Sequence, residues 1–109
     1  MSTLSTHVLD TMLGKPAPGI RVTLERDGVV LGSAVTDADG RVRDLIAKDP
    51  PLGAGSYRLS FSVADYFRQA GRESFWSDIV VQFTIAPGSE HYHVPLLLSP
   101  YGYSTYRGS

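Results

Sequence analysis

The side chains in this sequence that are best suited to chemistry belong to three histidines and one arginine. His7 lies near the start of the chain, and His91 and His93 form a His-x-His pair near its end. Imidazole titrates close to neutral pH, so histidines gathered on one sheet face suit general acid and base catalysis. Arg41 follows a predicted tight turn, where its guanidinium could bind an anionic or carbonyl-rich ligand at two points. Ordinary surface histidines on a solvated sheet face would give the same pattern.

The last nine residues, Tyr101–Ser109, form a polar segment rich in tyrosine. They contribute phenols, hydroxyl groups and the guanidinium of Arg107. Most chain termini are loose and carry little chemistry. We therefore expect this segment to form part of a site.

Apolar and polar residues alternate with a period of two through most of the sequence, which predicts short β-strands. One contains His7, and the others are expected at residues 20–25, 29–36, 41–46, 57–63, 79–85, 91–98 and 103–107. Asp27-Gly28 predicts a tight hairpin turn, because this pair readily adopts positive φ. A loop is expected at 49–55 and one short helix at 64–70, ending at Gly71. Short strands about ten residues apart predict an all-β, antiparallel sandwich or small barrel.

Alternation places all three histidines on the strand faces turned away from the core. The last two predicted strands are separated by a four-residue turn, 99–102, and should pair as a hairpin. One outer face could then carry His93, Ser104 and Tyr106 together. His7 joins them if the first strand, in which Ser5 shares its face, lies beside this hairpin.

Composition excludes several classes of function. The length of 109 residues predicts a single domain, 1–109, and the net charge of −1 gives no reason to expect binding to nucleic acid or to a membrane surface. There is no cysteine, hence no disulfide and no thiolate metal site. The first residues lack the features of a secretory signal, and no stretch reaches the ~18 apolar residues of a membrane helix. We expect a cytoplasmic protein.

A metal site is the main competing interpretation of the histidines. His7, His91 and His93 could imitate a three-histidine zinc site, although only Glu90 lies beside the pair to orient a ring. The segment 37–41 resembles the start of a calcium loop but lacks the later glutamate, so a simple turn is expected. No Gly-x-Ser-x-Gly elbow activates a serine. We predict no metal and no cofactor.

Taken together, these residues resemble the 5-hydroxyisourate hydrolases, the purine-catabolism branch of the transthyretin family. The resemblance covers nearly the whole chain and is carried by Leu4–Asp10, Gly14–Pro16, Thr36–Arg41, Gly55–Leu59, Asp65–Phe67 and His91–Ser109. Its most specific part is the Tyr-Arg-Gly-Ser ending, which the hormone-carrying transthyretins lack.

The resemblance implies a transthyretin-like sandwich of two four-stranded sheets with one short helix. It also implies a homotetramer, a dimer of dimers, with active sites in the channel between dimers. By the same resemblance the catalytic residues are His7, Arg41, His93 and Ser109. The residues that bind substrate are His7, Arg41, Ser104, Tyr106 and Arg107. His91 does not correspond to the family's catalytic histidine.

The implied reaction is hydrolytic opening of the six-membered ring of 5-hydroxyisourate. The product would be 2-oxo-4-hydroxy-4-carboxy-5-ureidoimidazoline, between urate and allantoin. One histidine, His7 or His93, would take a proton from the attacking water and the other would return one to the leaving nitrogen. Arg41 would stabilise the charge that grows on the carbonyl oxygen. The alternative is a carrier that holds a small ligand in the channel, as transthyretin does. The histidine, arginine and tyrosine side chains expected on the channel face favour catalysis over a carrier function.

Overall fold

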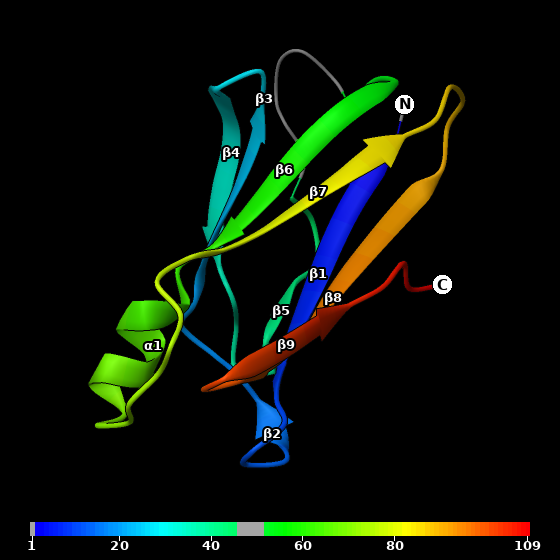
Figure 1. Ribbon diagram of the computed structural model, residues 1–109. Helices are drawn as coiled ribbons and strands as arrows, with labels where there is room; N and C mark the ends of the chain where they lie inside the picture. Colours follow the sequence, from blue (N-terminus) through cyan, green and yellow to red (C-terminus); the bar gives the residue numbers. More distant parts are fainter. Residues whose placement is uncertain (1, 46–51) are drawn as a thin grey trace.

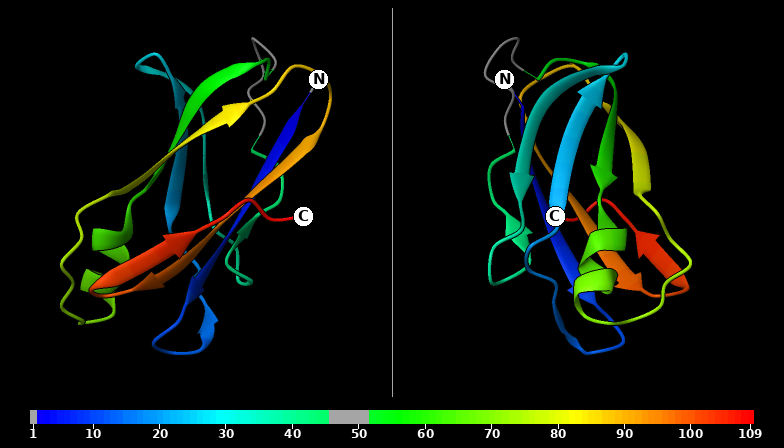
Figure 2. Two further views of the ribbon diagram at one scale, coloured as in Figure 1. Left: turned by 45° about the vertical axis from the view of Figure 1, so that its right-hand side comes forward. Right: turned by 90° about the vertical axis from the view of Figure 1, so that its left-hand side faces the viewer.

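Two β-sheets and one helix form the computed structural model, which describes residues 2–45 and 52–109 (Figure 1). The elements are β1 (Thr3–Asp10), β2 (Lys15–Pro16), β3 (Arg21–Arg26), β4 (Val29–Val35), β5 (Arg41–Val42), β6 (Gly55–Phe61), α1 (Val63–Gln69), β7 (Ile79–Ile85), β8 (His91–Ser99) and β9 (Gly102–Thr105). The β3–β4 turn lies at one end of the sandwich, and α1 and β2 lie at the other (Figure 2).

The first sheet has the strand order β2-β1-β8-β9, with β5 also paired to β1, and the second has the order β4-β3-β6-β7. The predicted two-sheet sandwich is confirmed, although the short strands β2 and β5 give the first sheet five strands rather than four. Pairing is antiparallel except between β1 and β8, which run parallel. These two strands are far apart in the sequence, so no hairpin turn forces them to be antiparallel.

Side-chain alternation builds the core between the sheets. In β1 every second residue, from Leu4 to Asp10, is buried, and Ser5 and His7 lie on the outer face. In β8 the residues Tyr92 and Val94 are buried, whereas His91 is exposed. The largest fully buried side chains come from both sheets, from α1 and, for Ile20 and Leu52, from connecting segments: Tyr57, Phe61, Phe67, Leu4, Ile20, Leu24, Leu52, Leu59, Ile79, Ile85, Leu96 and Leu98. The predicted outward direction of the histidines follows from this packing.

Two predicted turns set the ends of neighbouring elements. Asp27 and Gly28 have φ of 52° and 77° and join β3 to β4 as a two-residue hairpin. Gly71, with φ of 67°, ends α1: its N–H donates to Arg68 O (3.0 Å), and the Arg72 N–H donates to Phe67 O (2.9 Å). This pair of bonds is a Schellman motif, which stops the helix and carries Arg72 back toward β1. The helix was predicted to within one residue.

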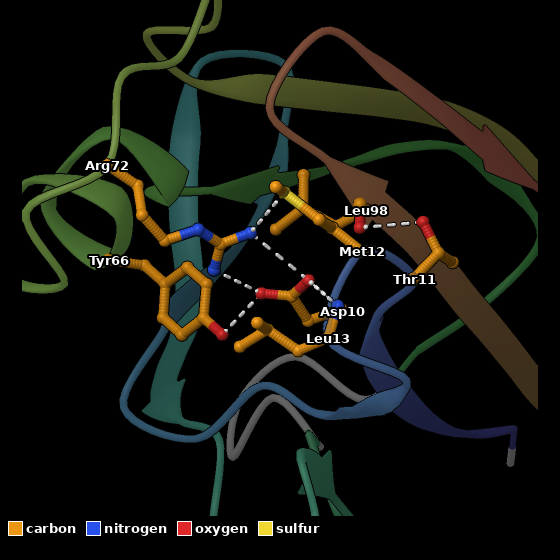
Figure 3. A network of polar contacts seen from close by, with 7 residues as sticks. All are labelled: Asp10, Thr11, Met12, Leu13, Tyr66, Arg72 and Leu98. Carbon is orange, nitrogen blue, oxygen red and sulfur yellow. Dashed lines mark hydrogen bonds and ion pairs between the residues drawn. The ribbon is translucent and has the colours of Figure 1, made fainter.

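Arg72 meets Asp10, the last residue of β1, in a buried network (Figure 3). The Asp10 carboxylate accepts hydrogen bonds from Arg72 Nη1 (2.6 Å), Tyr66 Oη (2.7 Å) and the Leu13 N–H (3.1 Å). Asp10 is fully buried, so these donors replace the water that the carboxylate has lost. The network joins α1 to the first sheet.

Three strand predictions extend at least two residues past the observed strand ends. The strand expected at 57–63 ends at Phe61, because α1 begins at Val63. The strand expected at 41–46 is only β5, because Arg43 turns back to face Asp37 (4.0 Å) and Asp39 (3.6 Å). The strand expected at 103–107 ends at Thr105. Residue 46 and part of the loop predicted at 49–55 lie outside the described residues. Within the described part of the chain no helix is long and apolar enough to span a membrane.

Candidate active site

The parallel pairing of β1 with β8 brings the histidines of both strands together. Thr3 lies opposite His91, Ser5 opposite His93 and His7 opposite Pro95. Residues at alternate positions of adjacent strands share one sheet face, so these polar side chains occupy the outer face of the first sheet. The predicted placement of His7 beside the strand of His93 is therefore observed.

A tight turn delivers Arg41 to the same face. Asp37 Oδ1 accepts hydrogen bonds from the Asp39 N–H (2.9 Å) and the Arg41 N–H (3.0 Å), and the bond from Arg41 is the main reason that the pKa of Asp37 is lowered. Gly40 has φ of 74°, and a Cβ there would collide with the Val8 carbonyl of β1. The turn can therefore lie close against β1, which sets Arg41 opposite His7.

The Arg41 guanidinium has no hydrogen-bond or ion-pair partner among residues 2–45 and 52–109. It lines an open cavity of about 250 Å³ on the outer face. The other lining residues are Ser5, Thr6, Arg43, His91, His93 and Ser109. A guanidinium without a partner at a cavity wall is available to a ligand with planar oxygen atoms.

His7 lies next to this cavity in a defined tautomer. Its Nε2 is 2.9 Å from the backbone oxygen of Asp39. A carbonyl oxygen only accepts, so Nε2 carries the proton and donates it to Asp39. The neutral ring of His7 then has a free lone pair on Nδ1, which can accept a proton.

His93 is half-buried, and its surroundings favour the neutral ring. Burial is the main cause of its lowered pKa; the positive charge of Arg41, and the charge of His7 or His91 whenever either ring is protonated, lower it further, while a hydrogen bond to the Ser5 backbone opposes them. A histidine held neutral near pH 7 can act as a general base.

Gly108 fixes the position of the His93 ring. The Gly108 N–H donates to His93 O (2.8 Å), and a Cβ at Gly108 would lie 2.5 Å from Cδ2 of the imidazole. The C-terminal segment therefore lies directly against the ring, and only glycine leaves the ring where it is. Ser109 follows at the cavity wall.

Tyr106 and Arg107 do not join His93 within one chain, contrary to our expectation for Tyr106. Both line a separate, largely apolar cavity of about 320 Å³ with Phe83, Tyr92 and other residues. Arg107 stacks on the Tyr92 ring, 4.4 Å from its centroid, and lies 3.7 Å from Glu90.

Pro95 explains this departure. The register that pairs Leu96 with Thr105 would place Tyr106 opposite Pro95, which has no N–H to donate. The Pro95 carbonyl instead accepts from the Thr105 hydroxyl (2.8 Å), and β9 ends there. Ser104 stays in the strand opposite Leu97, on the outer face but outside the cavity of His93.

The structure adds Ser5, which the sequence interpretation did not select, and gives a specific role to Gly108, which lies in the C-terminal segment expected at the site. Ser5 Oγ lies 2.8 Å from both His93 Nδ1 and His91 Nε2, and Gly108 supports the His93 ring. Alternation did place Ser5 on the face of His7, which was the available signal. No group of three or more His, Cys, Asp or Glu side chains could hold a metal ion in the described ranges, and this includes the three histidines.

Comparison with known proteins identifies the family to which the fold belongs. A model of the HIUase/Transthyretin family matches residues 4–108. The 5-hydroxyisourate hydrolase of Caulobacter vibrioides is 46% identical over 117 residues, covering 100% of both chains. The solved structure of the Klebsiella pneumoniae 5-hydroxyisourate hydrolase has a TM-score of 0.90 and 46% identity, again covering 100% of both chains.

A sea bream transthyretin solved in complex with thyroxine has the same fold, with a TM-score of 0.86 and 32% identity over 96% of this chain and 93% of that one. The fold alone thus accommodates both an enzyme and a ligand-binding protein. The chain belongs to the HIUase/Transthyretin family, and the full-length matches mark it as a hydrolase within that family.

Proposed function

We propose that this chain hydrolyses 5-hydroxyisourate to 2-oxo-4-hydroxy-4-carboxy-5-ureidoimidazoline in urate degradation. The observation that carries the proposal is the cavity that joins a guanidinium without a partner, Arg41, to the neutral base His93. The names of the Caulobacter and Klebsiella relatives support the choice of substrate. A planar ring rich in carbonyl groups suits both side chains.

The mechanism needs a base, an acid and a group that stabilises negative charge. His93 or His7 takes a proton from water as the oxygen attacks the ring carbonyl, and the other ring returns a proton to the leaving nitrogen. Arg41 holds the ring oxygens and stabilises the charge that develops on the carbonyl oxygen. All three groups belong to this chain, so we propose a reaction without metal or cofactor.

Ser109 lines the cavity and completes its wall in this proposal. Ser104, Tyr106 and Arg107 lie outside the cavity of their own chain, and we propose that they contact the substrate of a facing copy. A homotetramer with sites between dimers would allow this. Exposed aromatic side chains support such an assembly: Phe75, Tyr101, Tyr103 and Tyr106 are 74%, 68%, 42% and 57% exposed. We place the protein in the cytoplasm.

A coupled assay tests the proposal. Urate oxidase generates 5-hydroxyisourate in the cuvette, and its decay is followed by absorbance with substoichiometric protein, with and without EDTA. We expect decay well above the spontaneous rate and no effect of EDTA. An unchanged decay rate would exclude the hydrolysis, and loss of the acceleration with EDTA would exclude the metal-free mechanism.

A further inference from the structure

Four polar side chains form a continuous line of hydrogen bonds on the outer face of the first sheet. Thr3 Oγ1 lies 2.5 Å from Nδ1 of His91, and Ser5 Oγ lies 2.8 Å from Nε2 of the same ring. Ser5 Oγ also lies 2.8 Å from Nδ1 of His93. The parallel register of β1 and β8 produces this line, because it sets Thr3 and Ser5 opposite the two histidines.

The Ser5 hydroxyl couples the protonation of the two rings. It has one proton to donate, so it can donate to only one of them and must accept from the other. When Ser5 donates to Nε2 of His91, Nδ1 of His93 carries a proton and donates to Ser5. Nε2 of His93 is then free to act as a base, and His91 carries its own proton on Nδ1, facing Thr3.

We propose that Ser5 relays a proton from His93 to His91, which makes Ser5 and His91 working parts of the site. The inference rests on the proposed hydrolysis. As water forms its bond to the ring carbonyl carbon, its proton passes to His93 Nε2. The proton on His93 Nδ1 moves to Ser5 Oγ, and the Ser5 proton moves to His91 Nε2. His93 ends neutral and His91 ends as an imidazolium.

The environments of the two rings explain the direction of transfer. His93 is half-buried and faces Arg41 from β5 and His7 from β1, with Arg43 and Ser109 on the same cavity wall. A positive charge on His93 is therefore poorly solvated and repelled by Arg41. His91 is exposed, so water can solvate its imidazolium.

The protons balance through the solvent. His7 first takes a proton from the solvent on Nδ1, gives that proton to the leaving nitrogen as the C–N bond breaks, and so returns to its neutral form. The proton held on His91 then passes back through Ser5 to His93 Nδ1, as His93 Nε2 releases its proton to water. The sum is one water molecule added across the C–N bond, and the line Thr3–His91–Ser5–His93 returns to its starting state.

Removal of the Ser5 hydroxyl tests the relay. We expect Ser5→Ala to lower kcat about 10- to 100-fold with little change in KM, because the base loses the path for its proton. Ser5→Thr keeps a hydroxyl and is the matched control, with kcat within about threefold of the wild type. Melting temperatures of both variants establish that they are folded.

A double-mutant cycle separates a relay from two independent effects. His91→Gln should lower kcat about as much as Ser5→Ala, and the double variant should be no slower than the slower single variant. Full activity of folded Ser5→Ala, or losses that multiply in the double variant, would overturn the relay.

Nitrogen NMR of the protein without substrate gives a readout independent of turnover. We expect the neutral His93 ring of the wild type to carry its proton on Nδ1, and this preference to weaken in Ser5→Ala. A wild-type ring protonated on Nε2 would overturn the relay. Failure of the wild type to accelerate decay of 5-hydroxyisourate would instead overturn the proposed function, so the two failures are distinguishable.

Discussion

β1 supplies ionisable side chains to two regions, a buried network on its inner face and the candidate site on its outer face. Charges are paired in the first region and partly unpaired in the second. On its inner face Asp10 is fully buried and accepts four hydrogen bonds, two from Arg72 and one each from Tyr66 and the Leu13 N–H (Figure 3). On its outer face His7 lies beside Arg41, whose guanidinium has no partner within the described part of the chain. The inner network is saturated, and the outer face retains unused donors and acceptors.

The pKa shifts of the ionisable groups also differ between the two regions. Burial alone would raise the pKa of Asp10, but the hydrogen bonds from Arg72, Tyr66 and Leu13 outweigh it and lower the pKa. Burial, with the bond to Asp10, raises the pKa of Tyr66 to about 12. The pKa of His93 is lowered by burial and by positive neighbours. The first region keeps its charges paired to hold the fold, and the second keeps a neutral base beside a free cation, which suits chemistry.

His93→Gln gives the largest expected loss on the outer face. Glutamine keeps a hydrogen-bonding side chain but cannot accept a proton, so kcat should fall about 10²- to 10⁴-fold. The melting temperature should change little, because the ring lies outside the core. Steady-state assays and calorimetry on the same preparation measure both. A variant with wild-type kcat would remove His93 from the mechanism.

Asp10→Asn should produce the reverse pattern. It leaves the Arg72 guanidinium, only 18% exposed, without its counter-charge, so the free energy of unfolding should fall by about 3–5 kcal/mol. The exposed pair Asp65–Arg68 offers a control: Asp65→Asn should cost less than about 1 kcal/mol. Urea unfolding measures both variants.

The pH dependence sharpens this prediction. The folded pKa of Asp10 lies below its ordinary value of about 3.9, so its contribution to stability is complete above that pH. It is lost as the pH falls through the folded pKa, where the wild type should lose its advantage over Asp10→Asn. An advantage that is independent of pH in this range would contradict the ion pair.

Arg41→Gln should lower kcat/KM about 10²- to 10³-fold, because it removes the group that stabilises the developing charge. It should also raise the pKa of His93, since a positive neighbour disappears. The acid limb of the pH–rate profile, below the ordinary histidine value of about 6.5, should then move to higher pH. Arg41→Lys keeps the charge, so its acid limb should stay in place; a shift there would contradict the electrostatic cause.

Gly108→Ala should give the smallest loss of activity, and it tests whether Gly108 holds the His93 ring in position. The added Cβ would lie 2.5 Å from the ring, which must move, and kcat should fall about 10- to 100-fold. Gly102→Ala is the matched control, because the nearest atom to its Cβ is Ser99 Oγ at 3.5 Å. Equal activity of the two variants would show that the ring position does not depend on Gly108.

Some features of the fold and of the site could be predicted from the sequence, and others could not. Alternation predicted the sandwich and the outward histidines, because one buried sheet face imposes a period of two. It could not predict the parallel pairing of β1 and β8 or the bridge made by Ser5, since register between distant strands depends on the whole fold. Tyr106 was misplaced because one missing N–H, at Pro95, ends β9 early.

A single-turnover experiment with protein in excess tests the central claim most directly. Rising concentrations of the protein are mixed with a fixed amount of 5-hydroxyisourate, and the absorbance of the substrate is followed by stopped flow. A hydrolase should accelerate the decay to a rate that saturates with protein concentration, and His93→Gln should abolish most of the acceleration. A carrier would protect the bound molecule, so decay that is slowed or unchanged in excess protein would contradict the assignment of chemistry to the outer face.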